Sequence, residues 1–218
     1  MARRRPPPAS ARLAALAQTR TRLVEAARDI VAEKGWQGAQ VALIAARAKV
    51  ATGSVYRYFA SKADLYAEVL STVSQREVDV IRTIVDTDAP AAERLENAIQ
   101  AFVRRAMKAR RLAYALLAEP CDPEIDTARL RYRAAFGREI ARAIRAGIAC
   151  GEFADVDEAV AASCVTGAFM EALVGPLAPE TKPDSKAADR IASTIAKLCV
   201  RMVLKAERAG RASPARTR

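Results

Sequence analysis

Residues 41–66 read VALIAARAKVATGSVYRYFASKADLY and contain two short helical patterns joined by a tight turn. Apolar residues recur at helical spacing from Val41 to Ala48, which predicts a helix of about two turns. A second short helix is predicted from about Thr52 to Tyr58. Two short helices separated by so few residues are typical of a helix-turn-helix.

The flanking sequence completes a three-helix unit. A longer helix is predicted from about Ala14 to Gly35, a residue that favours a helix end. On the other side, Ser61 and Asp64 form a capping box, which predicts a new helix to about Val85. Downstream, helical patterns separated by Pro and Gly cover about 91–108, 110–118, 123–149, 156–175 and 186–208. The chain is therefore predicted to be all-α, with about nine helices and no strand.

Charge is concentrated at the two ends of the chain. The net charge is +11, and the first 24 residues carry six arginines and no acidic residue, whereas residues 67–204 are close to neutral. This distribution favours a polyanionic partner at the amino-terminal end. Residues 1–12 are rich in Arg, Pro and Ala and predict a disordered basic arm, and residues 210–218 predict a disordered basic tail.

Missing residue types exclude several classes of function. The chain has no histidine, so Ser-His-Asp triads, Cys-His dyads and HExxH zinc sites cannot form. The four cysteines form no CxxC pair, and no glycine-rich phosphate loop is present. We therefore expect no catalytic residue, no metal and no cofactor. No apolar run or signal core indicates a membrane segment, which favours a cytoplasmic protein.

The run from Arg22 to Leu70 resembles the DNA-binding domain of the TetR (tetracycline-repressor-like) family of transcriptional regulators. Residues 44–66 carry the most specific part of the resemblance, and the later helices match the family in number, length and order. The resemblance implies residues 13–66 as a DNA-binding domain and 67–209 as a ligand-binding and dimerisation domain. It also implies a homodimer on a palindromic operator of double-stranded DNA, usually a repressor, that a small-molecule effector releases.

The amino-terminal end of the second helix of a helix-turn-helix lies against base edges, where small groups permit close approach. Thr52, Gly53 and Ser54 occupy that end, and Tyr56, Tyr58 and Lys62 match family positions that hold the DNA backbone. The full set of predicted DNA contacts is Arg20, Arg22, Lys49, Thr52, Gly53, Ser54, Tyr56, Arg57, Tyr58 and Lys62. Three positions depart from the family pattern: Lys49 replaces the turn glycine, Ala51 replaces the usual Ser or Thr cap, and Tyr58 replaces a histidine. Because Ala is a poor cap, Thr52 is an alternative cap residue.

The later helices supply candidates for the effector pocket and for the dimer interface. Apolar residues that could line a cavity between helices are Phe102, Met107, Tyr114, Leu117, Phe136, Phe169, Met170 and Leu173, although each could equally be ordinary core. By family analogy the last two helices form the interface, through Val160, Cys164, Val165, Ala168, Ile191, Ile195, Leu198 and Met202.

Alternatives remain at this point. A nonspecific architectural DNA-binding protein would also be basic and helical, and a regulator of the same family could activate transcription or ignore ligands. The arginines at 3–5 could enter a minor groove or only solubilise the chain. Arginines along the helix at 123–149 favour an ion-paired or solvated face over an anionic-effector site. Cys121 is the thiol expected to be most exposed, and a redox role for it is a weak hypothesis.

Overall fold

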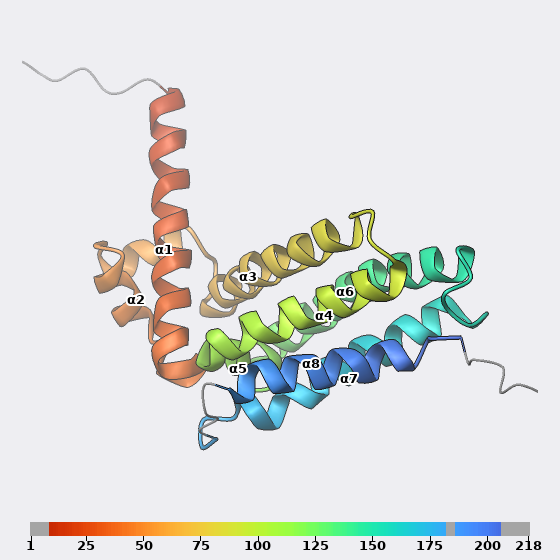
Figure 1. The fold of residues 1–218 in the computed structure, drawn as a ribbon. Coiled ribbons are helices and arrows are strands. Elements are labelled where there is room, and N and C mark those ends of the chain that lie inside the picture. Colours follow the sequence, from red (N-terminus) through yellow and green to blue (C-terminus); the bar gives the residue numbers. More distant parts are fainter. Residues whose placement is uncertain (1–8, 182–185, 206–218) are drawn as a thin grey trace, which may run out of the picture.

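The computed structural model describes residues 9–181 and 186–205, and its described part contains helices and no named strand. The elements, coloured along the chain in Figure 1, are α1 (Ala9–Gly38), α2 (Val41–Arg47), the 3₁₀ helix η1 (Thr52–Arg57), α3 (Lys62–Val85), α4 (Ala91–Lys108), α5 (Arg110–Leu117), α6 (Pro123–Ala149), α7 (Glu158–Leu177) and α8 (Ala187–Arg201). Together they confirm the predicted all-α fold.

Two elements differ from the sequence prediction. Helix α1 starts at Ala9, so residues 9–12 belong to a helix and the prediction that they are disordered is wrong. Ala, Arg and Leu that follow Pro8 are good helix formers, and proline is tolerated at a helix start. The last helix ends at Arg201, several residues before the predicted end. Residues 1–8 of the predicted arm and the predicted tail at 210–218 lie outside the described residues.

The two helix ends at Gly35 and Ser61 have the local chemistry that the sequence predicts. The Ser61 hydroxyl accepts a hydrogen bond from the backbone N–H of Asp64 at 3.0 Å, which confirms the cap of α3. At Gly35 the backbone turns to φ +70°, so the regular part of α1 ends where the sequence indicates. Asp122 and Pro123 begin α6, with the proline in its first turn.

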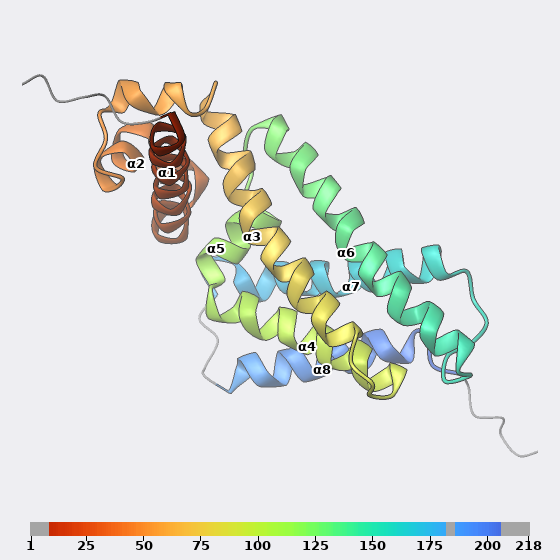
Figure 2. The same ribbon diagram turned by 90° about the horizontal axis from the view of Figure 1, so that it is seen from above.

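The buried side chains form two hydrophobic cores. The amino-terminal core joins α1, α2, η1 and the first half of α3, and it includes Leu23, Trp36, Ile44 and Tyr66. Ala115 of α5 is also fully buried in this core. The larger core lies among the second half of α3 and helices α4, α6, α7 and α8. Helix α3 therefore runs from one core into the other, and Figure 2 shows it extending from the α1–α2 unit along α6.

The long helices of the second core pack side by side. Helix α3 packs on α6, α4 packs on α8, and α6 packs on α7. Helix α7 is long and apolar enough to span a membrane by length and composition alone. Its inner face, however, supplies buried residues such as Val165, Phe169 and Leu173 to the larger core. Helix α7 is therefore a core helix of the bundle.

Candidate nucleic-acid interface and ligand cavity

The turn between α2 and η1 requires a left-handed residue, and Lys49 supplies it with φ +57°. The backbone N–H groups of Lys49 and Val50 bond to the carbonyls of Ala46 and Ala45 at 3.1 and 2.9 Å, which fixes the turn. Glycine adopts this conformation without steric cost, whereas the Cβ atom of lysine makes it unfavourable. The side chain of Lys49 is exposed beside η1, so the strained residue adds a cation at this surface.

The amino-terminal end of η1 presents small groups with free hydroxyls. Ala51 is the cap residue and makes no side-chain cap bond, so Thr52 is the first helical residue and is not the cap. In the described part of the chain, the hydroxyls of Thr52 and Ser54 have no hydrogen-bond partner. A Cβ atom added at Gly53 would meet no protein atom within 4 Å. This end of η1 is therefore open to a partner outside the chain.

Aromatic and basic side chains follow on the same segment. Tyr56 is 54% exposed, Tyr58 is half-buried against the amino-terminal core, and Phe59 is buried. The exposed Arg57 forms no ion pair within the described residues. Lys62, in the first turn of α3, places its ammonium group 5.1 Å from the ring centre of Tyr66. Hydroxyl, guanidinium and ammonium groups are the donors that usually bind phosphate oxygens.

The two arginines of α1 that are predicted to contact DNA differ in whether their charge is already paired. Arg20 pairs with Glu68, and its guanidinium lies 4.6 Å from the ring centre of Phe59. Arg22 is exposed and donates only to the hydroxyl of Thr19, at 3.2 Å. Arg22 therefore offers a free cation, whereas the charge of Arg20 is already balanced.

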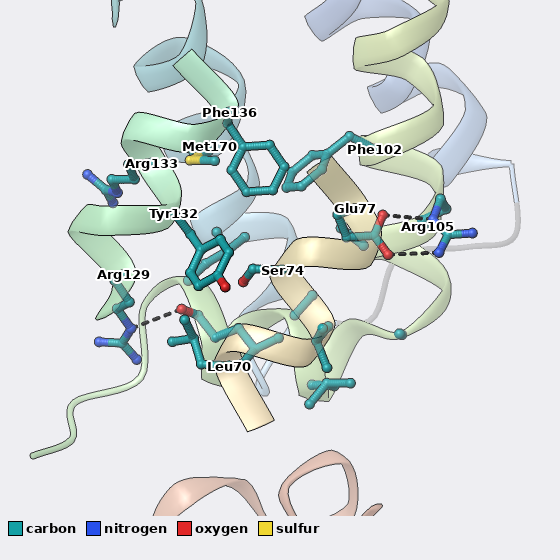
Figure 3. A pocket seen from close by; sticks show the side chains of 17 residues that line it. Leu70, Ser74, Glu77, Phe102, Arg105, Arg129, Tyr132, Arg133, Phe136 and Met170 are labelled. Carbon is teal, nitrogen blue, oxygen red and sulfur yellow. Dashed lines mark hydrogen bonds and ion pairs between the residues drawn. The ribbon is translucent and has the colours of Figure 1, made fainter. Parts of the chain in front are cut away.

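A cavity of about 90 Å³ opens between α3, α4, α5 and α6 (Figure 3). Of the predicted pocket residues, Phe102, Leu117, Phe136 and Met170 line this cavity. The others do not: Met107, Phe169 and Leu173 are buried in the larger core, and Tyr114 is half-buried at its edge. The sequence shows which residues are apolar, but helical spacing does not show which of them face an unfilled space.

Glu77, Arg105 and Arg129, three of the four charged residues that line the cavity, have protein partners. Glu77 and Arg105 form two hydrogen bonds of 2.7 and 2.8 Å, and these raise the pKa of Arg105. Arg129 donates to the carbonyls of Leu116, Ala115 and Glu119 at 2.9, 2.7 and 2.6 Å, and to Asp126 at 2.7 Å. The pairing of Glu77 with Arg105 and the carbonyls that hold Arg129 join segments that are distant in the sequence, so the sequence does not show these contacts.

Helix α5 links the cavity to the amino-terminal core. Leu112 and Leu116 line the cavity and also pack against that core. The indole N–H of Trp36 donates to the carbonyl of Ala115 at 2.6 Å. The backbone N–H of Trp36 donates to the buried carboxylate of Glu119 at 3.3 Å.

Arg111 completes this junction. Its guanidinium donates to both oxygens of Glu119, at 2.9 and 3.1 Å, directly over Gly35. A shift of α5 would therefore move groups that hold the end of α1.

Helices α7 and α8 leave part of their surface exposed and apolar. Val160, Leu198 and Met202 are 60, 55 and 50% exposed, and Cys164 is also exposed. A Cβ atom added at Gly167 on α7 would meet open space. Among the remaining predicted interface residues, Val165 and Ile195 lie in the chain's own core, and Ala168 and Ile191 are half-buried. The exposed set, Val160, Cys164, Gly167, Leu198 and Met202, is called the α7–α8 face below.

Two minor hypotheses can also be placed in the structure. On α6, Arg142 pairs with Asp86 and Glu139, and Arg145 pairs with Glu158. These pairs agree with an ion-paired surface. The prediction that Cys121 is the most exposed thiol is wrong: Cys150 and Cys164 are exposed, whereas Cys121 is half-buried, and burial raises the pKa of its thiol. A raised pKa leaves less of the reactive thiolate at neutral pH.

The fold and the open end of η1 define a helix-turn-helix protein with a helical body. Two family models then match in succession: the bacterial regulatory proteins of the tetR family over residues 23–69, and the tetracyclin repressor-like C-terminal domain over residues 88–172. The chain belongs to the TetR family of bacterial regulatory proteins.

Similar proteins include both curated relatives and solved structures. An uncharacterized HTH-type transcriptional regulator of Mycobacterium tuberculosis is 31% identical over 131 residues, which are 60% of this chain and 59% of the relative. The match thus spans less than two thirds of that relative. Bacillus subtilis FadR, solved with stearoyl-CoA, is 21% identical with a TM-score of 0.71, covering 83% of this chain and 97% of FadR. RolR, solved with resorcinol, is 21% identical with a TM-score of 0.67, covering 88% and 90%. At these identities the two structures show a shared fold.

Proposed function

We propose that the protein is a cytoplasmic homodimeric repressor that binds a palindromic operator and leaves it when a small molecule enters the cavity. The observation that carries the proposal is the position of α5. One side of this helix lines the cavity, and Ala115 on the other side is buried in the core that positions η1. The two relatives solved with resorcinol and with stearoyl-CoA support a ligand-responsive body.

The DNA contacts divide into two groups by their chemistry. Thr52, Gly53 and Ser54 would approach base edges, because their hydroxyls are free and Gly53 leaves open space. Cations and tyrosine hydroxyls around them would bind phosphates: Arg22, Lys49, Tyr56, Arg57, Tyr58 and Lys62. Arg20 would contribute only if DNA displaced its partner Glu68.

The α7–α8 face supplies the proposed dimer interface. An exposed apolar surface that continues over two adjacent helices is typical of an interaction site. A two-fold dimer places two copies of η1 on DNA, and half-sites of a palindrome are separated by about one helical turn or a multiple of it. The dimer therefore fixes which operator spacing the protein can read.

The proposed release mechanism is a shift in population between two dimer states. A ligand that fills the cavity presses on Leu112 and Leu116, and the Trp36–Ala115 and Trp36–Glu119 bonds carry the displacement of α5 to α1. The ligand favours the state whose η1 spacing no longer matches the operator. Equal spacing of the two η1 helices in operator-bound and ligand-bound crystals would contradict this mechanism.

The test is fluorescence anisotropy of the full-length protein on duplex DNA from its own upstream region and on a scrambled duplex, at about 50 and 200 mM salt. We expect a preference for the upstream duplex that persists at the higher salt. Arg57→Ala should weaken binding to both duplexes, whereas Thr52→Ala should lower the preference between them. Arg104→Ala, which removes an ion pair with Asp189 on the body, is the matched control.

Two alternatives give different results in the same assay. A nonspecific architectural protein would bind both duplexes equally, and its binding to both would be lost at 200 mM salt. An activator, or a regulator without a ligand, would keep the operator preference. A reporter gene fused to the upstream region, measured with and without the regulator, separates an activator from a repressor.

A further inference from the structure

The cavity between α3, α4, α5 and α6 is small and mostly apolar. Its volume of about 90 Å³ is below that of an engineered apolar cavity of about 150 Å³ that binds benzene. The aromatic rings of Phe102, Phe136 and Tyr132 lie around it (Figure 3), with Leu70 and Met170. Because exposed residues such as Arg133 are among those that line it, the cavity reaches the surface, and a ring that enters it can lie partly outside. The space therefore takes at most one small ring and is too small for a long acyl chain.

Two hydroxyl groups give this apolar space a polar side. Ser74 of α3 and Tyr132 of α6 both line the cavity (Figure 3). Tyr132 bonds to the hydroxyl of Ser71 at 2.6 Å, which leaves its oxygen able to form another hydrogen bond. In the described part of the chain, Ser74 forms no side-chain hydrogen bond at all. A ligand hydroxyl or carbonyl could therefore bond to one or both groups.

Three of the four charged residues that line the cavity already have protein partners. Glu77 and Arg105 neutralise each other, and Arg129 is held by backbone carbonyls and Asp126. Arg133 is exposed, and Figure 3 shows its side chain extending away from the rings of Tyr132 and Phe136. A charged group moved from water into such a site without a partner is strongly disfavoured.

We infer that the effector is a small uncharged ring compound whose hydroxyl or carbonyl group bonds to Ser74 and Tyr132. This inference rests on the proposed function, because it takes the cavity to be the effector site. It adds the class of ligand: one ring, no net charge and at least one polar substituent.

The test compares three probes of similar size on the full-length protein by isothermal titration calorimetry: phenol, benzoate and benzylamine. At neutral pH they are neutral, anionic and cationic. We expect phenol to bind with a dissociation constant on the order of 1 mM, because so small a ligand gains little contact, and to bind at least about tenfold more tightly than the other two. Benzoate or benzylamine binding as tightly as phenol would overturn the inference.

Variants then place the probe in the cavity. Ala113→Leu adds bulk to the cavity wall on α5 and should abolish phenol binding, whereas Ala134→Leu, the same change at an exposed position of α6, should leave it unchanged. Ser74→Ala and Tyr132→Phe should each weaken phenol binding by roughly 2- to 10-fold through loss of one hydrogen bond. Circular dichroism confirms that each variant folds. Phenol binding that survives in folded Ala113→Leu, or that neither hydroxyl variant weakens, would overturn the inference.

Operator binding, measured on the same samples, separates this inference from the proposed function. A protein that prefers its operator but binds no phenol refutes the ligand class and leaves the DNA-binding proposal standing. Phenol that binds in the cavity without weakening operator binding supports the ligand class and refutes the release mechanism.

Discussion

Gly35 lies where the end of α1 meets α5, and adding one methyl group there should have a large effect. The residue has φ +70° and ψ −176°, a backbone region that is essentially restricted to glycine and that costs about 1–3 kcal/mol for a residue with a Cβ atom. An added Cβ would also overlap the guanidinium of Arg111 and the carboxylate of Glu119. The Gly35→Ala protein must therefore adopt a strained backbone and displace the ion pair that holds Trp36.

The expected loss of stability follows from these two terms. Removing one partner of a buried ion pair costs about 3–5 kcal/mol, but here both partners remain and Arg111 is 30% exposed, so we take about 1–2 kcal/mol for the displacement. Alanine also restricts the unfolded chain, which returns about 0.4–1 kcal/mol. We expect Gly35→Ala to lower the free energy of unfolding by about 2–4 kcal/mol.

Trp36, the only tryptophan of the chain, is the natural probe for this experiment. It is buried next to the substituted residue, so its fluorescence follows urea unfolding at the junction. The control is Gly137→Ala on α6, where an added Cβ meets open space and helix propensity predicts a gain of about 0.5–1 kcal/mol. Both proteins are compared at one concentration, because the stability of the proposed dimer would depend on concentration. Equal urea midpoints for the two variants would refute the argument.

Three further predictions concern other parts of the molecule. Lys49→Gly should raise the free energy of unfolding in urea melts by about 1 kcal/mol, because glycine relieves the left-handed turn. The same change should lower the salt dependence of DNA binding, measured by anisotropy, by about one phosphate contact. Gly167→Leu should convert a dimer to a folded monomer in analytical ultracentrifugation, whereas Gly137→Leu should remain dimeric. The carboxylate of Glu152 accepts hydrogen bonds from the first N–H groups of α4, including that of Ala92, and these lower its pKa. The contribution of Glu152 to the free energy of unfolding is therefore present above the ordinary pKa of Glu and disappears as the pH falls through the lowered pKa. In urea melts, Glu152→Gln should destabilise the protein at pH 7 and make no difference at strongly acidic pH.

The fold was predictable because its signals are local. Helical spacing, the Ser61 cap and the breaks at proline and glycine lie within one or two turns of the residues that they govern. These signals place α3 and α4 at their observed ends. The start of α1 was missed because prolines and arginines close to Ala9 suggested disorder, although helix formers follow them.

The candidate sites depend on contacts between residues that are distant in the sequence, so less of the sites than of the fold could be predicted. The η1 residues could be predicted because one continuous segment carries them all. The cavity could not: Ser74 comes from α3 whereas Arg129 and Tyr132 come from α6, and only packing shows that they line one cavity. The same limit applies to Val165, whose apolar side chain fits a dimer interface by pattern but packs into its own core.

The position of α5 explains how a small cavity could control a distant DNA interface. The helix has only eight residues, from Arg110 to Leu117, so residues on its two sides are close in sequence and cannot move independently. Ala113 and Leu116 face the cavity, while the carbonyl of Ala115 binds the indole of Trp36. A ring that enlarges the cavity must therefore displace groups that hold the end of α1. Because Trp36 belongs to the same core as η1, a ligand needs to favour only a small displacement of α5 to change how the two recognition helices of a dimer meet DNA.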